Sequence, residues 1–101
     1  MKDRYIDKIR RIIINGLSEY PVRIYLFGSR VSGTPSQSSD CDVGLDFKGE
    51  IPPGVLSAVR EELEESHVPY RVELVDLSET SPDFTKKVRE EGIPWYNSMS
   101  D

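Results

Sequence analysis

A glycine–serine pair and two aspartates stand at a spacing that suits phosphate and metal chemistry. Gly28 and Ser29 follow an apolar run, and ten residues separate them from Asp40 and Asp42. Glycine lets the backbone approach an anion, and Ser29 adds a hydroxyl and an amide N–H. Asp40 and Asp42 alternate, so on an extended strand both carboxylates point to one face. Parallel carboxylates repel unless a cation lies between them, and Mg²⁺ accepts such ligands together with substrate phosphates, so the pattern predicts nucleotide chemistry.

A third carboxylate is expected from Glu73, which alternates with apolar residues in a short β-branched run. If this strand lies beside the one with Asp40 and Asp42, Glu73 completes a triad. Two members would then hold metal on a triphosphate, and the third would share a metal and accept the proton of an attacking hydroxyl. Asp76 has the opposite parity and is expected at the strand end. The alternative interpretation of Glu73 is an exposed glutamate on an edge strand.

Length and composition set the broad class of protein. We expect residues 1–101 to form one small domain with a single core. No apolar run reaches membrane-spanning length, and the N-terminus lacks the apolar stretch of a secretory signal. A single cysteine, Cys41, fits a reducing cytoplasm, and one Cys with one His argues against a zinc site built from protein ligands. The net charge of −5 argues against general binding of nucleic acid or direct contact with its backbone.

Helical and alternating patterns follow one another along the chain. Period-2 runs predict strands, and 3.6-residue periodicity predicts helices. Expected helices cover residues 3–18, 55–66 and 81–91, and expected strands cover 22–27, 40–47 and 71–77. Residues 30–39 are expected to form a short helical turn and a loop, and residues 93–96 to pack on the core or form a short edge strand. The fold class is therefore α/β (α+β), with a small mixed β-sheet flanked by helices.

The string LFGSRVSGTPSQSSDCDVGLDF carries a family resemblance. It resembles the DNA polymerase β nucleotidyltransferase superfamily, and more closely its minimal nucleotidyltransferase (MNT) branch. The resemblance extends over nearly the whole chain and implies a polymerase β-like nucleotidyltransferase fold. It also implies transfer of a nucleoside monophosphate to an acceptor hydroxyl, with pyrophosphate leaving. In that branch a domain of this size stands alone, and a separately encoded, all-helical HEPN protein is often its partner.

The resemblance also implies roles for individual residues. It assigns nucleotide binding to Gly28, Ser29, Arg30 and Ser39. It assigns metal binding and catalysis to Asp40, Asp42 and Glu73. The implied cofactor is Mg²⁺, as two ions, or Mn²⁺ in its place, and the implied substrate is ATP. Glu73 departs from the aspartate usual in the branch, and Gly44 stands where a bulkier apolar or another small residue is common.

Three functions remain open at this point. Larger enzymes of the superfamily add a domain for the acceptor, so we expect another chain to supply it here. The first hypothesis is an antitoxin that transfers AMP from ATP to a tyrosine of a HEPN toxin, an RNase. The second is a catalytically idle antitoxin or binding module that acts by complex formation, and the third is the catalytic subunit of a small-molecule nucleotidyltransferase. Exposed strand edges and terminal aromatic residues leave room for a homo- or hetero-oligomer, and no motif specifies the nucleobase.

Overall fold

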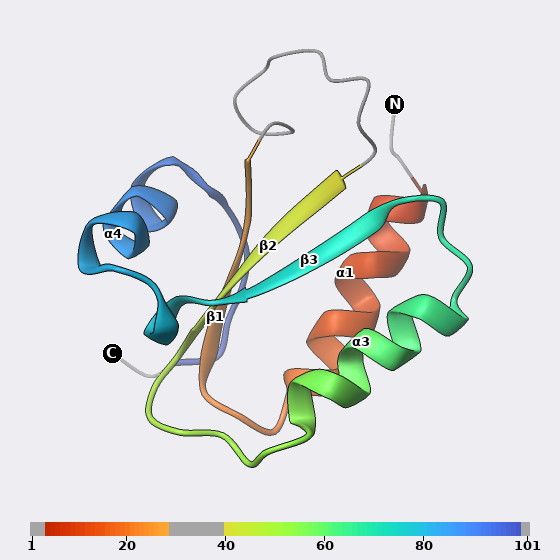
Figure 1. Ribbon diagram of the computed structural model, residues 1–101, viewed down its shortest axis with the longest axis horizontal. Helices are drawn as coiled ribbons and strands as arrows, with labels where there is room; N and C mark the ends of the chain where they lie inside the picture. The colour runs from red at the N-terminus through yellow and green to blue at the C-terminus, as the bar shows by residue number, and fades with distance from the viewer. Residues whose placement is uncertain (1–3, 29–39, 100–101) are drawn as a thin grey trace.

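The computed structural model describes residues 4–28 and 40–99. Its centre is a four-stranded sheet with the order β3-β2-β1-β4 (Figure 1). Strand β1 runs antiparallel to both β2 and β4, whereas β2 and β3 are parallel, so the sheet is mixed as predicted. The strands are β1 (Val22–Phe27), β2 (Asp40–Phe47), β3 (Arg71–Asp76) and β4 (Ile93–Asn97).

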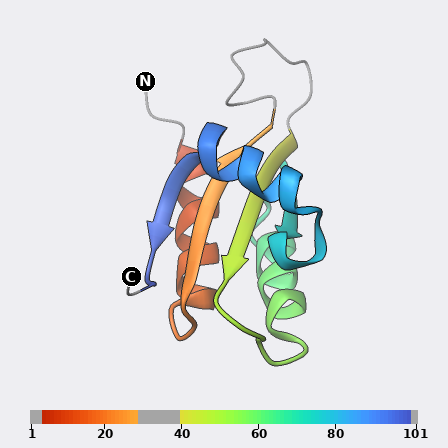
Figure 2. The same cartoon turned by 90° about the vertical axis from the view of Figure 1, so that its left-hand side faces the viewer.

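Helices cover both faces of the sheet. Helices α1 (Arg4–Leu17) and α3 (Val55–Glu65) pack side by side on one face. Helix α4 (Pro82–Glu91) crosses the opposite face, and Figure 2 shows it lying in front of the strands. A short 3₁₀ helix, η1 (Leu77–Glu79), connects β3 to α4.

The main core lies between the sheet and the pair α1 and α3. Alternate residues of β2 enter it, beginning with the fully buried Cys41, and the helices contribute residues at helical spacing such as Ile9 and Ile13. Each fully buried aliphatic side chain of this kind stabilises the fold by roughly 1.5–3 kcal/mol. Because side chains alternate along a strand, Asp40, Asp42, Gly44 and Asp46 belong to the opposite face, where α4 lies.

Helix α4 has clear start and stop signals. The Ser81 hydroxyl accepts a hydrogen bond from the Phe84 N–H at 3.2 Å, and Pro82 occupies the first helical position. Gly92 ends the helix, donating its N–H to the Val88 carbonyl at 2.8 Å. A Cβ at Gly92 would lie 2.6 Å from that carbonyl oxygen and 3.2 Å from that of Leu26, so only glycine lets the helix end this close to β1.

The close approach of α4 also explains Gly44, whose departure from the family pattern had no evident reason in the sequence. A Cβ on this residue would lie 3.2 Å from Val88 Cγ1 and 3.4 Å from Leu77 Cδ1. Val88 and Leu77 form a second, smaller core with Tyr25 on this face. Gly44 therefore provides the space into which α4 and η1 pack.

The structure confirms most of the expected elements. The strands over 22–27 and 40–47 have the expected bounds, β3 ends one residue early at Asp76, and residues 93–97 form an edge strand. Asp76 lies at the strand end as predicted, where its carboxylate caps η1 by accepting from the Ser78 N–H. The helical turn and loop expected over residues 30–39 lie outside the described residues. None of the helices in residues 4–28 and 40–99 combines the length and apolar composition needed to cross a bilayer.

Candidate active site

Three carboxylate residues lie on the α4 side of the sheet, at the end where β1 finishes. In the parallel ladder Asp42 is paired with Glu73, and Asp40 is paired with Arg71. Paired residues on neighbouring strands point to the same face, so Asp40, Asp42 and Glu73 share it. The triad expected from the sequence required the strand of Glu73 to lie beside the strand of Asp40 and Asp42, and the structure confirms this position.

The electrostatics of Asp42 reflect this grouping. Partial burial raises the pKa of the Asp42 carboxyl above its ordinary value, and the negative charges of Asp40 and Glu73 raise it further. Desolvation combined with like charge disfavours the ionised form, and such perturbed groups cluster at functional sites. A cation bound here would relieve the repulsion and hold Asp42 ionised.

Gly28 brings the turn after β1 directly against Asp42. Its φ is +88°, in the left-handed region that favours glycine. A Cβ at this position would overlap the Asp42 carboxylate oxygen and lie 3.1 Å from its Cγ. The backbone of the turn and the carboxylate therefore belong to one site, and a side chain at position 28 would fill the space between them.

Replacing Gly28 with alanine is expected to destabilise the protein by about 1–3 kcal/mol more than the matched change Gly49→Ala. Gly49 has nearly the same φ, +85°, but a Cβ there meets nothing within 4 Å. The control therefore carries only the backbone cost, about 1 kcal/mol. Urea unfolding of both variants measures the difference, and equal losses would show that the contact with Asp42 carries no cost.

The side chain of Glu73 is turned along its own strand. Its Oε2 lies 4.0 Å from Nε of Arg71, and the two side chains are 58% and 79% exposed. Within residues 4–28 and 40–99, no three His, Cys, Asp or Glu side chains converge closely enough to hold a metal ion. The donor chemistry nevertheless fits a hard cation, because Asp40 and Asp42 offer carboxylate oxygens from alternate positions of one strand. Mg²⁺ or Mn²⁺ would complete its shell with phosphates and water.

The remaining residues of the predicted site fall outside the described chain. They are Ser29, Arg30 and Ser39. Those that the structure places are Gly28, Asp40, Asp42 and Glu73, and it brings all of these to one end of one sheet face.

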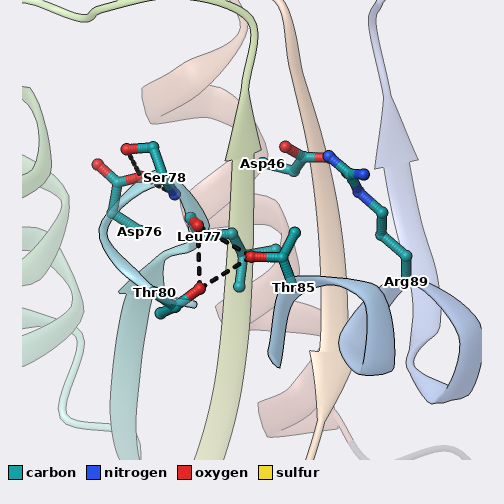
Figure 3. A network of polar contacts seen from close by, with 7 residues as sticks. All are labelled: Asp46, Asp76, Leu77, Ser78, Thr80, Thr85 and Arg89. Carbon is teal, nitrogen blue, oxygen red and sulfur yellow. Dashed lines mark hydrogen bonds and ion pairs between the residues drawn. The ribbon is translucent and has the colours of Figure 1, made fainter. Parts of the chain in front are cut away.

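One polar contact beside the site was not predicted. The carboxylate oxygen Oδ2 of Asp46 accepts a hydrogen bond from Nε of Arg89 at 2.9 Å and forms an ion pair with Nη2 of the same side chain, also at 2.9 Å (Figure 3). Asp46 is only 7% exposed, and the pair ties α4 to β2, the strand that carries Asp40 and Asp42. The alternation of β2 places Asp46 on this face from the sequence, but no sequence signal links it to a helix residue 43 positions away.

A hydroxyl network holds the other end of α4, also shown in Figure 3. The Leu77 carbonyl accepts from Thr80 Oγ1 at 2.9 Å and from Thr85 Oγ1 at 3.0 Å. Since Leu77 belongs to η1 and Thr85 to α4, the network fixes the turn between them. Helix α4 is thus tied to β2 by Arg89 near its C-terminus and to η1 by Thr85 near its N-terminus.

Residues 8–101 match the family described as "Polymerase beta, Nucleotidyltransferase". The chain belongs to this family. The match covers almost the entire chain and includes the turn after β1 and all the carboxylates described above. It confirms the polymerase β-like fold and makes the protein a member of the nucleotidyltransferases.

This nucleotidyltransferase is similar to a Haemophilus influenzae protein named "Probable protein adenylyltransferase MntA". The two are 29% identical over 89 residues, which span 88% of this chain and 76% of the relative. A solved toxin–antitoxin structure with AMP-PNP is 25% identical, with a TM-score of 0.65 over 89% of this chain and 74% of that one.

Two further solved structures share the fold. One is the complex of a tri-AMPylated Shewanella oneidensis HEPN toxin with an MNT antitoxin, with a TM-score of 0.67, 21% identity, and coverage of 97% of this chain and 74% of that one. The other is assigned to the minimal nucleotidyltransferases, with a TM-score of 0.70, 21% identity, and coverage of 93% and 96%. The mixed sheet and its flanking helices are therefore the architecture of this family.

Proposed function

We propose that this nucleotidyltransferase transfers AMP from ATP to a tyrosine hydroxyl of a HEPN-type partner protein, and that it acts in this way as a cytoplasmic antitoxin. The observation that best supports this proposal is the position of Asp42, which lies against the Gly28 turn and beside Asp40 and Glu73 on one sheet face. A backbone turn suited to phosphates and carboxylates suited to a divalent cation are the parts that phosphoryl-type transfer needs.

The relatives support the choice of nucleotide and acceptor. The H. influenzae relative is named for protein adenylyl transfer, and one structural neighbour was solved with an ATP analogue. Another neighbour contains a HEPN toxin that carries three AMP groups beside its MNT antitoxin. These statements concern the relatives, and they make ATP and a HEPN protein the first substrates to test here.

In the proposed reaction the acceptor oxygen attacks the α-phosphorus, the bond from that phosphorus to the bridging oxygen breaks, and pyrophosphate leaves. Asp40 and Asp42 would hold Mg²⁺, which when bound supplies charge neutralisation for the phosphates and the leaving group. Backbone N–H groups of the turn at Gly28 would orient the triphosphate, together with Ser29, Arg30 and Ser39.

Glu73 is the proposed acceptor of the hydroxyl proton. It neighbours Asp42 on β3, and its exposed side chain is open to an acceptor arriving from solvent. Rotation away from Arg71 would bring the carboxylate toward Asp42, since Arg71 and Glu73 form only a long, solvated ion pair. A glutamate has one more methylene than the aspartate usual in the MNT branch, which gives its carboxylate a longer reach.

A co-expression experiment tests the proposed function. We expect the wild-type protein to restore growth of cells that produce a toxic HEPN-type partner. The Asp40→Asn/Asp42→Asn variant should still bind that partner but fail to restore growth, because it lacks the charges that hold the cation. Pull-down of the partner by both forms is the control for complex formation. Full rescue by the double variant would favour an antitoxin that acts by binding alone.

A further inference from the structure

A pocket of about 150 Å³ lies between the end of β1 and helix α4. Phe27 and Gly28 form its wall on the strand side. From the helix and its end it is lined by Phe84, Lys87, Val88, Glu91 and Gly92. The pocket is separate from the main core, which lies on the other face of the sheet. Nothing in the proposed chemistry has so far required it.

The pocket is continuous with the candidate active site. Phe27 is paired with Asp42 across β1 and β2, so the two side chains are neighbours on one face. Gly28 lines the pocket and also contacts the Asp42 carboxylate. If the phosphates of a nucleotide lie at the Gly28 turn, its nucleoside can therefore reach this pocket.

The lining is suited to a flat aromatic group. The rings of Phe27 and Phe84 meet edge to face, with centroids 5.7 Å apart and an angle of 81° between the planes. Phe84 stays 37% exposed, so part of its ring is accessible to a ligand. Pockets that enclose whole drug-sized ligands begin near 300 Å³, so this smaller space suits one ring system only.

Lys87 adds a positive charge at the same place. Among residues 4–28 and 40–99 its ammonium takes part in no ion pair or hydrogen bond, although the protein carries a net charge of −5. Glu91 also lines the pocket and contributes a negative charge, so the charge of the lining as a whole does not select an anion. The ammonium of Lys87 is nevertheless available to a phosphate of a ligand whose aromatic group enters the pocket.

We propose that this pocket binds the nucleobase of the nucleoside triphosphate, which stacks on Phe84 while Lys87 faces its phosphates. The proposal rests on the proposed function and deepens it by naming the part of the chain that holds the nucleoside. Every base has a π-face, so stacking of this kind discriminates weakly between bases. We expect ATP and GTP to bind with similar affinity.

Isothermal titration with Mg²⁺-ATP and with Mg²⁺-tripolyphosphate separates the base from the phosphates. Phe84→Ala is expected to weaken ATP binding by about tenfold or more, the usual effect of losing one base–aromatic stack, and to leave tripolyphosphate binding unchanged. Phe84→Tyr keeps the ring and should bind ATP as the wild type does. Lys86→Ala is the matched control, because Lys86 lies on the same helix, outside the pocket, and its ammonium pairs with Glu90 at 3.9 Å.

The possible outcomes distinguish failure of the nucleobase pocket from failure of the proposed function. Equal ATP affinity of the wild type and Phe84→Ala would overturn the nucleobase pocket and leave the proposed function standing. Equal losses for ATP and tripolyphosphate would overturn it as well, since the side chain would then act through the fold. Failure of the wild type to bind either ligand would overturn the proposed function and the pocket together.

Discussion

Replacing Asp42 with asparagine is expected to lower nucleotidyl transfer by about 10³-fold or more and, at the same time, to stabilise the metal-free protein. A metal that neutralises charge in the transition state contributes several kcal/mol, and each 1.36 kcal/mol is a factor of ten in rate. The stabilisation follows from the neighbours of Asp42: Asp40 and Glu73 repel its charge, and partial burial disfavours it. The Asp42 carboxylate is thus expected to support transfer while it lowers the stability of the metal-free protein.

The pH dependence of this stabilisation has a definite sign. Because the pKa of Asp42 is raised in the folded state, the native protein holds this proton more tightly than the unfolded chain. Stability therefore falls as pH rises from the ordinary aspartate value, about 3.9, through the raised folded pKa. Asp42→Asn should exceed the wild type in the free energy of unfolding at pH 7 and lose this advantage below about pH 4.

Urea unfolding in EDTA at several pH values measures the stability effect, and Mg²⁺ provides the contrast. Added Mg²⁺ should stabilise the wild type, because a ligand that binds only the native state raises its stability, and should have less effect on Asp42→Asn. Glu61→Gln, which removes an exposed carboxylate on α3, is the control and should change neither activity nor stability. A metal-free Asp42→Asn protein less stable than the wild type would show that the charge of Asp42 does not destabilise the fold.

Replacing Arg89 with alanine is expected to cost about 3 kcal/mol of folding free energy. The change leaves Asp46, which is 7% exposed, without the two 2.9 Å contacts that satisfy its charge. Removing one partner of a buried ion pair costs about 3–5 kcal/mol, and the 49% exposure of the Arg89 side chain places the loss at the lower end. Since Arg89 anchors α4, we also expect weaker ATP binding in the pocket beside that helix.

A double-mutant cycle with Asp46→Ala checks this prediction by thermal or urea unfolding. The double variant should be less destabilised than the sum of the two single variants, because it removes the unpaired charge together with its partner. Lys86→Ala breaks the exposed Lys86–Glu90 pair and should cost less than 0.5 kcal/mol. Similar losses for Arg89→Ala and Lys86→Ala would show that Asp46 does not depend on Arg89.

Local patterns in the sequence were sufficient to predict the helices and strands and to predict which face of the sheet each strand residue occupies. The alternation of β2 placed Asp40 and Asp42 together and Cys41 in the core, and the parity of β3 selected Glu73 over Asp76. The caps of α4 could also be read, because Ser81 and Gly92 act on backbone groups within one turn of themselves. These features depend on neighbours in the sequence, which is why they could be predicted.

Contacts between distant elements could not be predicted. The ion pair of Asp46 with Arg89 and the ring contact of Phe27 with Phe84 join β-strands to a helix that follows much later in the chain. These contacts form because α4 packs closely over Gly44. The position of the helix on the sheet is determined by tertiary packing and not by local propensity. The contact of Glu73 with Arg71 was not predicted either, although the two residues are only two positions apart on β3. The extent of a single domain over residues 1–101 stays a prediction.

Transfer of label from α-³²P-ATP in the presence of Mg²⁺ tests whether Asp40 and Asp42 support nucleotidyl transfer to a partner protein. The purified protein is incubated with the HEPN-type partner, beside the Asp40→Asn/Asp42→Asn variant and an EDTA control. We expect label on the partner with the wild type and none with the variant or with EDTA. An intact complex that carries no label would contradict catalysis by these carboxylates and would make the protein an antitoxin that acts by binding.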